Sequence, residues 1–267
     1  MKNKETSWGG VAGWYDELLE QSSDSFQSRV IMPNLIRILD PKPGMKVADV
    51  ACGQGYFSRA FAANGADVVA CDISPELIEL AKAKPLGAPT SKGPAVKPGQ
   101  LAFSVAPADS LSFMSDGSVD ALTIILAIQN IENLAGTMAE AARVLRAGGR
   151  LILVTNHPAF RIPKASSWVW DDKSATQYRR IDAYMSDSKV EIDMTPGADK
   201  PADKKLTVSF HRPLQSYFKA MSKAGLAVSR LEEWISHKES QKGPRQEAED
   251  RIRKEIPMFL MLEAKKI

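Results

Sequence analysis

Two aspartates flank a glycine-containing loop in the first half of the chain. Asp49 lies in the apolar segment 46–50, Gly53-Gln54-Gly55 follow it, and Asp72 comes directly after the next apolar segment, 67–71. A carboxylate at position 49 would repel a pyrophosphate but favours a ligand with an ammonium or sulfonium charge. Asp72 comes at about the spacing at which an acid accepts hydrogen bonds from ribose hydroxyl groups. Together, these residues predict a site for a positively charged nucleoside with a free ribose.

Each of these residues also has a simpler interpretation. Glycines after a strand are needed for steric reasons in many folds, Asp72 could cap the following helix, and Asp49 could be a hydrogen-bonded polar group in the core. The third glycine of the dinucleotide-binding fingerprint is absent, because Ser58 stands in its place. The loop and the two acids taken together favour a ligand site over these alternatives.

The elements that would position this site follow an alternating pattern. Apolar segments at 46–50, 67–71, 101–105, 121–127 and 150–155 are separated by turns and helical patterns. Beyond residue 205 the pattern predicts a strand at 206–210, a helix at 214–224, and strands at 226–234 and 258–264. Short apolar strands that alternate with helices indicate an α/β fold with a parallel sheet and helices on both faces.

Four motifs in register resemble those of the class I S-adenosylmethionine-dependent methyltransferases. Residues 47–55 (VADVACGQG) resemble motif I, Asp72 the motif II acid, residues 106–109 (APAD) the adenine-contacting segment, and residues 143–151 (RVLRAGGRL) the helix, turn and fifth strand. The close match covers residues 14–156, and the rest resembles small-molecule members in layout. The resemblance implies a doubly wound, Rossmann-like seven-stranded sheet, mostly parallel with an antiparallel last strand, and a cap or lid insertion after the fifth strand.

The resemblance also implies S-adenosylmethionine as the cofactor and a set of residues that bind it. Gly53 and Gly55 would let the backbone approach the methionine part near Asp49, Asp72 would hold the ribose, and Asp109 would accept from the adenine amino group. Tyr15 occupies the position of a residue that closes over the methionine carboxylate. The full predicted set is Tyr15, Asp49, Cys52, Gly53, Gln54, Gly55, Asp72, Ile73, Ala108, Asp109 and Ala127.

Methyl transfer from a sulfonium is an in-line displacement, so a general base is needed only when the acceptor must lose a proton. His157 and His211 are the candidate bases, with a structural hydrogen-bonding role open for both, and His237 is expected at the surface. The segment 127–130 reads AIQN where related small-molecule enzymes commonly carry a histidine. The Asn-Pro-Pro-Tyr type of motif is absent there, which disfavours methylation of adenine or glutamine amino groups.

Residues 160–184 interleave aromatic and basic side chains. They could form a lid that stacks on the acceptor, a nucleic-acid surface, or a helical cap packed on the sheet. Trp168, Tyr178 and Arg212 are the candidate acceptor-binding residues, since Arg212 could bind an anionic group. The domain division predicted is a helical arm at 1–40, the cofactor-binding core at 41–156, the insertion at 157–205 and the C-terminal part of the sheet at 206–267.

Composition narrows the class of protein. The chain has 267 residues and a net charge of +3, which gives no reason to expect nucleic acid or an anionic membrane as the main partner. The N-terminus is polar, and the longest apolar run, 121–128, is too short to cross a bilayer. We therefore expect no membrane insertion. The two cysteines form no CxxC pair, so we expect no metal site and, as for free thiols in a reducing compartment, a cytoplasmic location.

The sequence therefore predicts a methyltransferase that uses S-adenosylmethionine and a small-molecule acceptor, with O-methylation slightly favoured over C- or N-methylation. A nicotinamide-dependent oxidoreductase is one alternative, against which Asp49 and the missing third glycine argue. A non-catalytic cofactor-binding protein on the same fold is another, suggested by Gln129 and Asn130. An RNA methyltransferase is a further variant. The sequence identifies neither the acceptor nor the oligomeric state.

Overall fold

A seven-stranded sheet forms the centre of the molecule. The computed structural model describes residues 8–13, 24–87, 96–195 and 204–267. The strands of the sheet are, in chain order, β1 (Lys46–Val50), β2 (Asp67–Asp72), β3 (Leu101–Val105), β4 (Val119–Ile125), β5 (Leu145–Asn156), β10 (Leu226–Trp234) and β11 (Phe259–Lys266). Their spatial order is β10-β11-β5-β4-β1-β2-β3. The last strand, β11, runs antiparallel to both of its neighbours, and the other pairs in this sheet are parallel. The predicted seven-stranded, mostly parallel fold is confirmed.

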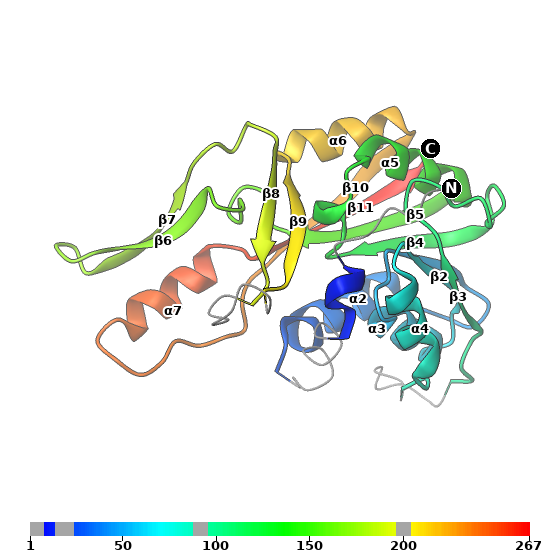
Figure 1. The fold of residues 1–267 in the computed structure, drawn as a ribbon, viewed down its shortest axis with the longest axis horizontal. Helices are drawn as coiled ribbons and strands as arrows, with labels where there is room; N and C mark the ends of the chain where they lie inside the picture. Colours follow the sequence, from blue (N-terminus) through cyan, green and yellow to red (C-terminus); the bar gives the residue numbers. More distant parts are fainter. Residues whose placement is uncertain (1–7, 14–23, 88–95, 196–203) are drawn as a thin grey trace.

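Helices cover both faces of the sheet because its central strands are apolar on both sides. Helices α2 (Met32–Leu39), α3 (Tyr56–Ala63) and α4 (Pro75–Ala83) lie on one face, and α5 (Leu134–Val144) and α6 (Leu214–Lys223) on the other (Figure 1). Leu35 and Phe61 belong to the first apolar cluster, and Met138 and Met221 to the second. All four side chains are fully buried. The two clusters fix the sheet whose carboxyl edge carries the candidate site.

The segment after β5 forms two hairpins outside this sheet. In the first, β6 (Ser166–Asp171) pairs with β7 (Thr176–Ile181), and in the second, β8 (Ser188–Asp193) pairs with β9 (Leu206–His211); both pairs are antiparallel. Figure 1 shows both hairpins beside the sheet. The alternative of a helical cap is therefore wrong for the described residues. The strand expected at 206–210 exists, but it pairs with β8, so the C-terminal part of the main sheet begins after it.

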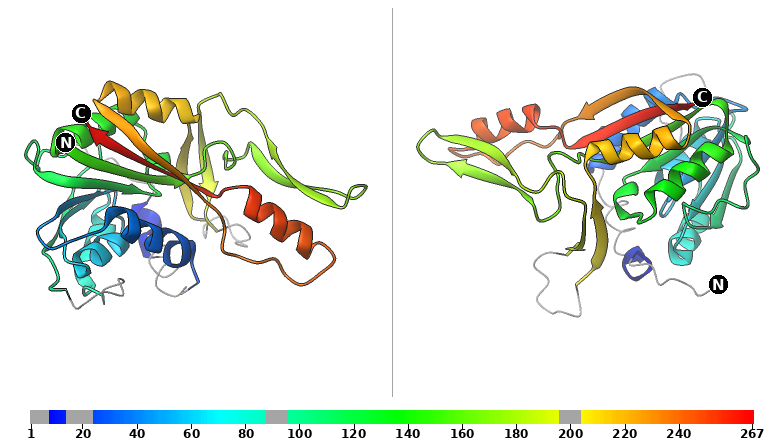
Figure 2. Two further views of the ribbon diagram at one scale, coloured as in Figure 1. Left: turned by 180° about the vertical axis from the view of Figure 1, so that it is seen from behind. Right: turned by 90° about the horizontal axis from the view of Figure 1, so that it is seen from above.

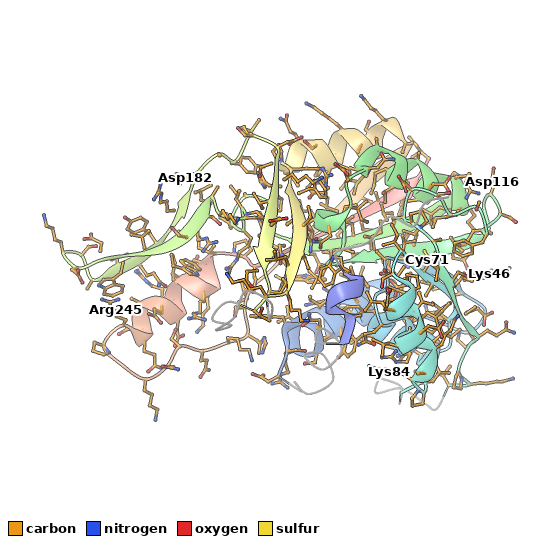
Figure 3. The ribbon with its side chains drawn as sticks, in the orientation of Figure 1. Lys46, Cys71, Lys84, Asp116, Asp182 and Arg245 are labelled. Atoms are coloured by element: carbon orange, nitrogen blue, oxygen red, sulfur yellow. The ribbon has the colours of Figure 1, made fainter. Side chains whose placement is uncertain are left out.

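The polar stretch 236–254, expected as a solvated excursion, contains most of α7 (Gln246–Glu255), in which no residue is buried. This helix lies against β7 of the first hairpin (Figure 2). At its amino end the Arg245 guanidinium lies over the ring of Trp170, 4.6 Å from the ring centroid (Figure 3). Trp170 of the insertion therefore contacts the amino end of this helix, whereas Phe160 packs against His157 and Tyr184 against His211.

Two searches of the described part of the chain gave negative results. No helix there has both the length and the apolar character required to cross a membrane. No group of histidine, cysteine and acidic side chains there is placed to bind a metal ion.

Candidate active site

The loop between β1 and α3 owes its shape to residues in the left-handed backbone region. Ala51, Gly53 and Gly55 have φ values of 57°, 59° and 77°. At Gly55 a Cβ would also come within 2.7 Å of Cζ of Phe103, so a side chain is excluded by packing as well as by conformation. Non-glycine residues in this region are strained, and such residues gather at functional sites. Ala51 after β1 and Leu126 after β4 (φ 51°) are two examples at the same edge of the sheet.

Asp49 is a buried carboxylate with two hydroxyl donors. Its side chain accepts hydrogen bonds from Oγ of Ser58 at 2.5 Å and from Oγ1 of Thr123 at 2.8 Å. Burial raises the pKa of Asp49 from 3.8 to about 6, the two hydroxyl groups oppose this rise, and the nearby charge of Asp72 adds to it. The satisfied hydrogen bonds agree with the structural interpretation of Asp49. The raised pKa also indicates that a positively charged ligand would stabilise the ionised carboxylate of Asp49.

Asp72 joins the end of β2 to the loop. Its Oδ2 accepts from the backbone N–H of Gly53 and its Oδ1 from the backbone N–H of Ser74, both at 2.9 Å. Burial raises the pKa of Asp72, while these two N–H donors act in the opposite direction. Ser74 itself caps α4, as its Oγ accepts from the N–H of Leu77. Asp72 is therefore the anchor of the loop and not the helix cap.

A cavity of about 750 Å³ lies at the carboxyl ends of β1, β2 and β4. In parallel α/β sheets this edge is where ligands bind. The cavity is lined by seven of the predicted cofactor-binding residues: Asp49, Cys52, Gly53, Gln54, Asp72, Ile73 and Ala127. Residues that sequence reasoning missed also line it, namely Trp8, Ala51, Tyr56, Phe57, Leu77, Ile125, Leu126, Asn130 and Ile131. Ala51 lies within the motif at 47–55 and Asn130 within the segment 127–130 noted in the sequence, but no motif or spacing pointed to the others.

Four of the predicted cofactor-binding residues are not among those that line this cavity. Gly55 faces Phe103, Ala108 is buried in the core, and Asp109 accepts a hydrogen bond from Nδ2 of Asn133 at 2.7 Å. Tyr15 lies outside the described residues.

One buried donor in the cavity wall has no protein partner. Oε1 of Gln54 accepts from the Arg59 guanidinium at 2.8 Å, but its Nε2 is buried and finds no acceptor within the described part of the chain. An unmade hydrogen bond of a buried amide costs about 1–3 kcal/mol, which a ligand oxygen would recover. The cavity thus combines an unused donor with two buried carboxylates. This set fits the carboxylate, ammonium and ribose groups of S-adenosylmethionine.

A second, much smaller pocket lies beside the first, between the end of β5, β9 and the start of α6. It is lined by Gln129, Thr155, Asn156, Pro158, Arg161, Pro163, Ser209, Phe210, His211, Arg212 and Tyr217. The turn η3 (Ile128–Asn130) separates the two pockets, since Asn130 lines the first and Gln129 the second.

The amide side chains of that turn are held by the protein. Nδ2 of Asn130 donates to the carbonyl oxygen of Val208 at 2.7 Å. Gln129 donates to the carbonyl oxygen of Leu126 and accepts from Oγ1 of Thr155. Both residues therefore fix the wall between the pockets.

The two candidate bases differ in their hydrogen bonds. Nδ1 of His157 accepts from the N–H of Ala159 at 3.2 Å, so its Nε2 carries the proton donated to Glu233 at 2.8 Å. Burial lowers the pKa of His157. His157 lines neither pocket, whereas His211 lines the second and donates from Nε2 to the carbonyl oxygen of Tyr184. His211 thus keeps Nδ1 as its basic nitrogen. His237 contacts Asp24 near the surface.

The structure brings Arg212 into the second pocket but not the two aromatic candidates. Trp168 lies between the guanidinium groups of Arg161 and Arg179, which are 5.7 Å and 5.0 Å from its ring centroid. Tyr178 is 47% exposed on β7. Both lie on the first hairpin and neither lines a pocket, although Trp168 contacts Arg161, which lines the second.

Comparisons with known proteins agree with this geometry. Residues 48–153 match a family described as a methyltransferase domain. A demethylmenaquinone methyltransferase of Beutenbergia cavernae is 36% identical over 115 residues, 43% of this chain and 42% of that protein. A ubiquinone biosynthesis O-methyltransferase of Xanthomonas campestris is 32% identical over 113 residues, 42% of this chain and 44% of that protein. The chain spans 42% to 62% of the length of the demethylmenaquinone methyltransferases that it matches.

Among solved structures, an S-adenosylmethionine-dependent methyltransferase from Mesorhizobium loti superposes with a TM-score of 0.61 at 24% identity, over 87% of this chain and 96% of that one. The likeness in fold thus extends well beyond the matched domain. Residues 48–153 thus match a methyltransferase domain, and the fold around them is similar to that of solved S-adenosylmethionine-dependent methyltransferases, proteins that use S-adenosylmethionine as cofactor.

Proposed function

We propose that the protein transfers the methyl group of S-adenosylmethionine to a small-molecule acceptor. The observation that supports this most strongly is the cavity that unites the buried carboxylates of Asp49 and Asp72 with the unpartnered Nε2 of Gln54. A cationic nucleoside with a free carboxylate satisfies all three groups. The roles of Tyr15, Ala108 and Asp109 toward the cofactor are part of the same proposal.

The cofactor supplies a methyl group that is already activated by the sulfonium charge. The protein then contributes mainly alignment, because in-line displacement needs the acceptor atom close to the methyl carbon. We place the acceptor at the second pocket with its reactive atom directed past the turn Ile128–Asn130 into the first, since Asn130 lines the first pocket and Gln129 the second. That placement presents the acceptor to the cofactor from the side of β5 and β9.

O-methylation is the favoured reaction within this proposal. One relative, the ubiquinone biosynthesis O-methyltransferase, is named for transfer to oxygen, whereas the name of the demethylmenaquinone methyltransferase does not give the acceptor atom. A hydroxyl acceptor must lose its proton, and His211 is better placed than His157 to take it, since it lines the second pocket with a basic Nδ1. We propose action in the cytoplasm, because Cys52 and Cys71 are free thiols, as expected in a reducing compartment.

Calorimetric titration with S-adenosylmethionine and S-adenosylhomocysteine tests the first step. We expect binding of both at micromolar concentrations, and no binding of either would refute the proposal. Incubation with methyl-labelled cofactor and a panel of phenols, catechols and quinols then tests transfer. Binding without transfer to any acceptor would identify a non-catalytic cofactor-binding protein instead. Loss of transfer in His211→Gln, with cofactor affinity unchanged, would support its role as the base.

A further inference from the structure

The second pocket holds two guanidinium groups and no carboxylate. Its lining contains Arg161 and Arg212 together with His211, and no aspartate or glutamate is among the residues that line it. Salt bridges elsewhere in the described residues pair most arginines with an acid, but neither Arg161 nor Arg212 has one there. Cations placed in a pocket without counter-ions attract an anionic ligand.

We infer that the acceptor carries an anionic group, a carboxylate or a phosphate, and that Arg161 binds it in the second pocket with the help of Arg212. The inference rests on the proposed function, because it concerns the substrate of that reaction. It goes further by fixing the chemical class of the acceptor and the residue that recognises it.

Arg161 has an unused donor. Its Nε is buried and has no hydrogen-bond partner among the described residues. Its guanidinium lies over the ring of Trp168, which orients the group without neutralising its charge. The pKa of Arg161 is lowered to about 10, first by burial and then by the charges of Arg179 and Arg253. The guanidinium of Arg161 is therefore a partly buried cation close to other cations. An anionic ligand would offset both the cost of burying its charge and the repulsion from its neighbours.

Arg212 is held rigidly in the opposite wall. It is 8% exposed, and its guanidinium donates to the carbonyl oxygens of Ile128, Ile131 and Glu132. These neutral acceptors fix its position but leave its positive charge in place. Because the same carbonyls belong to the segment around η3, Arg212 also ties the acceptor pocket to the wall of the cofactor cavity.

Two acids of the neighbouring segments have other partners. Glu233 accepts from Nε2 of His157 at 2.8 Å, and the carboxylate of Glu132 pairs with Lys189 at 3.3 Å. A third acid, the exposed Asp187, is close enough to Tyr217 for its charge to raise the pKa of that phenol, but it forms no salt bridge with either arginine. Within the described part of the chain neither Arg161 nor Arg212 is therefore directly paired with a carboxylate.

Matched ligands test the inference on the full chain saturated with S-adenosylhomocysteine. The probes are 4-hydroxybenzoate, 4-hydroxyphenyl phosphate and the neutral 4-hydroxybenzamide, and binding is followed by ligand-observed NMR and calorimetry. We expect the anions to bind more tightly than the amide by about tenfold, the size of one charge-assisted hydrogen bond. The carboxylate and the phosphate distinguish the two sources of negative charge.

Three variants complete the test. Arg161→Gln should abolish the preference for anions, while Arg161→Lys should keep part of it. Arg180→Gln is the matched control, because Arg180 is an exposed arginine on β7 of the same insertion and pairs with Asp182 at 2.8 Å; it should behave as the wild type. Equal binding of the amide and the anions, or a preference that survives Arg161→Gln, would overturn the inference. Failure to bind S-adenosylhomocysteine would instead overturn the proposed function.

Discussion

The hydroxyl group of Ser58 in α3 donates a hydrogen bond to Oδ2 of Asp49 in β1 across 2.5 Å. The sequence shows two separate departures from a dinucleotide-binding site, an acid in the first strand and a serine in place of the third glycine. In the structure they form one arrangement, because the buried carboxylate needs a donor that glycine does not have. The serine is thus part of how this fold keeps an acid beneath the cofactor.

Replacement of Ser58 by glycine should therefore weaken cofactor binding. The variant restores the third glycine but removes one of the two hydroxyl donors to Asp49, so the pKa of Asp49 should rise further. We expect a loss of affinity for S-adenosylmethionine of about tenfold near neutral pH, the value of one hydrogen bond to a charged group. Calorimetry measures it, and an affinity equal to that of the wild type would show that Ser58 does not support the site.

Cofactor affinity should depend on pH through Asp49. Its pKa is raised to about 6 in the cofactor-free protein, and a cationic ligand binds better to the ionised form. Affinity for S-adenosylmethionine should then rise as the pH increases from about 5 to about 7.5. Asp49→Asn should lower the affinity at neutral pH and remove this dependence, and a similar pH profile in the variant would exclude Asp49 as its origin.

The same substitution should stabilise the cofactor-free fold above the pKa of Asp49. Because the folded pKa lies above 3.8, the folded state holds the proton more tightly, and the free energy of unfolding falls as the pH rises from about 4 to about 6. Asp49→Asn removes that loss, which amounts to at most about 3 kcal/mol. Urea unfolding at acidic and neutral pH measures the difference. A variant less stable than the wild type at neutral pH would contradict this expectation.

Asp72 should be coupled to the ribose of the ligand. In the wild type, 5′-methylthioadenosine should bind more tightly than its 2′-deoxy analogue, whereas in Asp72→Asn the two should differ by much less. The expected coupling energy is about 1–2 kcal/mol. Asp67→Asn, at the other end of β2, is the control, since the carboxylate of Asp67 accepts from the backbone N–H of Gln100. An unchanged difference in Asp72→Asn would remove the ribose assignment.

Two glycines with positive φ should respond differently to alanine. A Cβ at Gly44 (φ 81°) would meet no atom within 4 Å. Gly44→Ala should therefore lower the free energy of unfolding only by the cost of a positive φ, about 1 kcal/mol. At Gly55 (φ 77°) the added methyl also collides with Phe103, so Gly55→Ala should cost about 1–3 kcal/mol more. Thermal unfolding compares the two, and Phe103→Leu should recover part of the loss. Equal losses would mean that the packing under the loop does not matter.

The core of the fold could be predicted because its strands are buried on both faces. Leu151–Val154 is a continuous apolar run, Val47–Val50 is apolar except for Asp49, and the turns between elements carry glycine and proline. The structure of the insertion could not be predicted from the sequence, because β6 and β7 contain no fully buried residue and so show no alternation of apolar and polar side chains. The helix α7 was missed for the same reason, since none of its residues is buried.

The candidate site likewise contains residues that could be predicted from the sequence and residues that could not. Asp49, Gly53 and Asp72 could be recognised because a local motif places them at strand ends. Trp8 lies far from that motif in sequence and reaches the cavity only through the fold. Arg161 belongs to an irregular segment, and its place in the second pocket depends on how that segment leaves β5. Such long-range placement has no periodic signature.

The two hairpins leave the sheet after Asn156 and end at Arg212, just before α6, and both residues line the second pocket. The hairpins between them can therefore change in length or sequence in evolution without altering strand order or the loop beneath the cofactor. Recognition of the methyl donor and choice of the acceptor can then evolve independently of each other. Exchange of residues 157–211 between related chains should then transfer acceptor preference as a module.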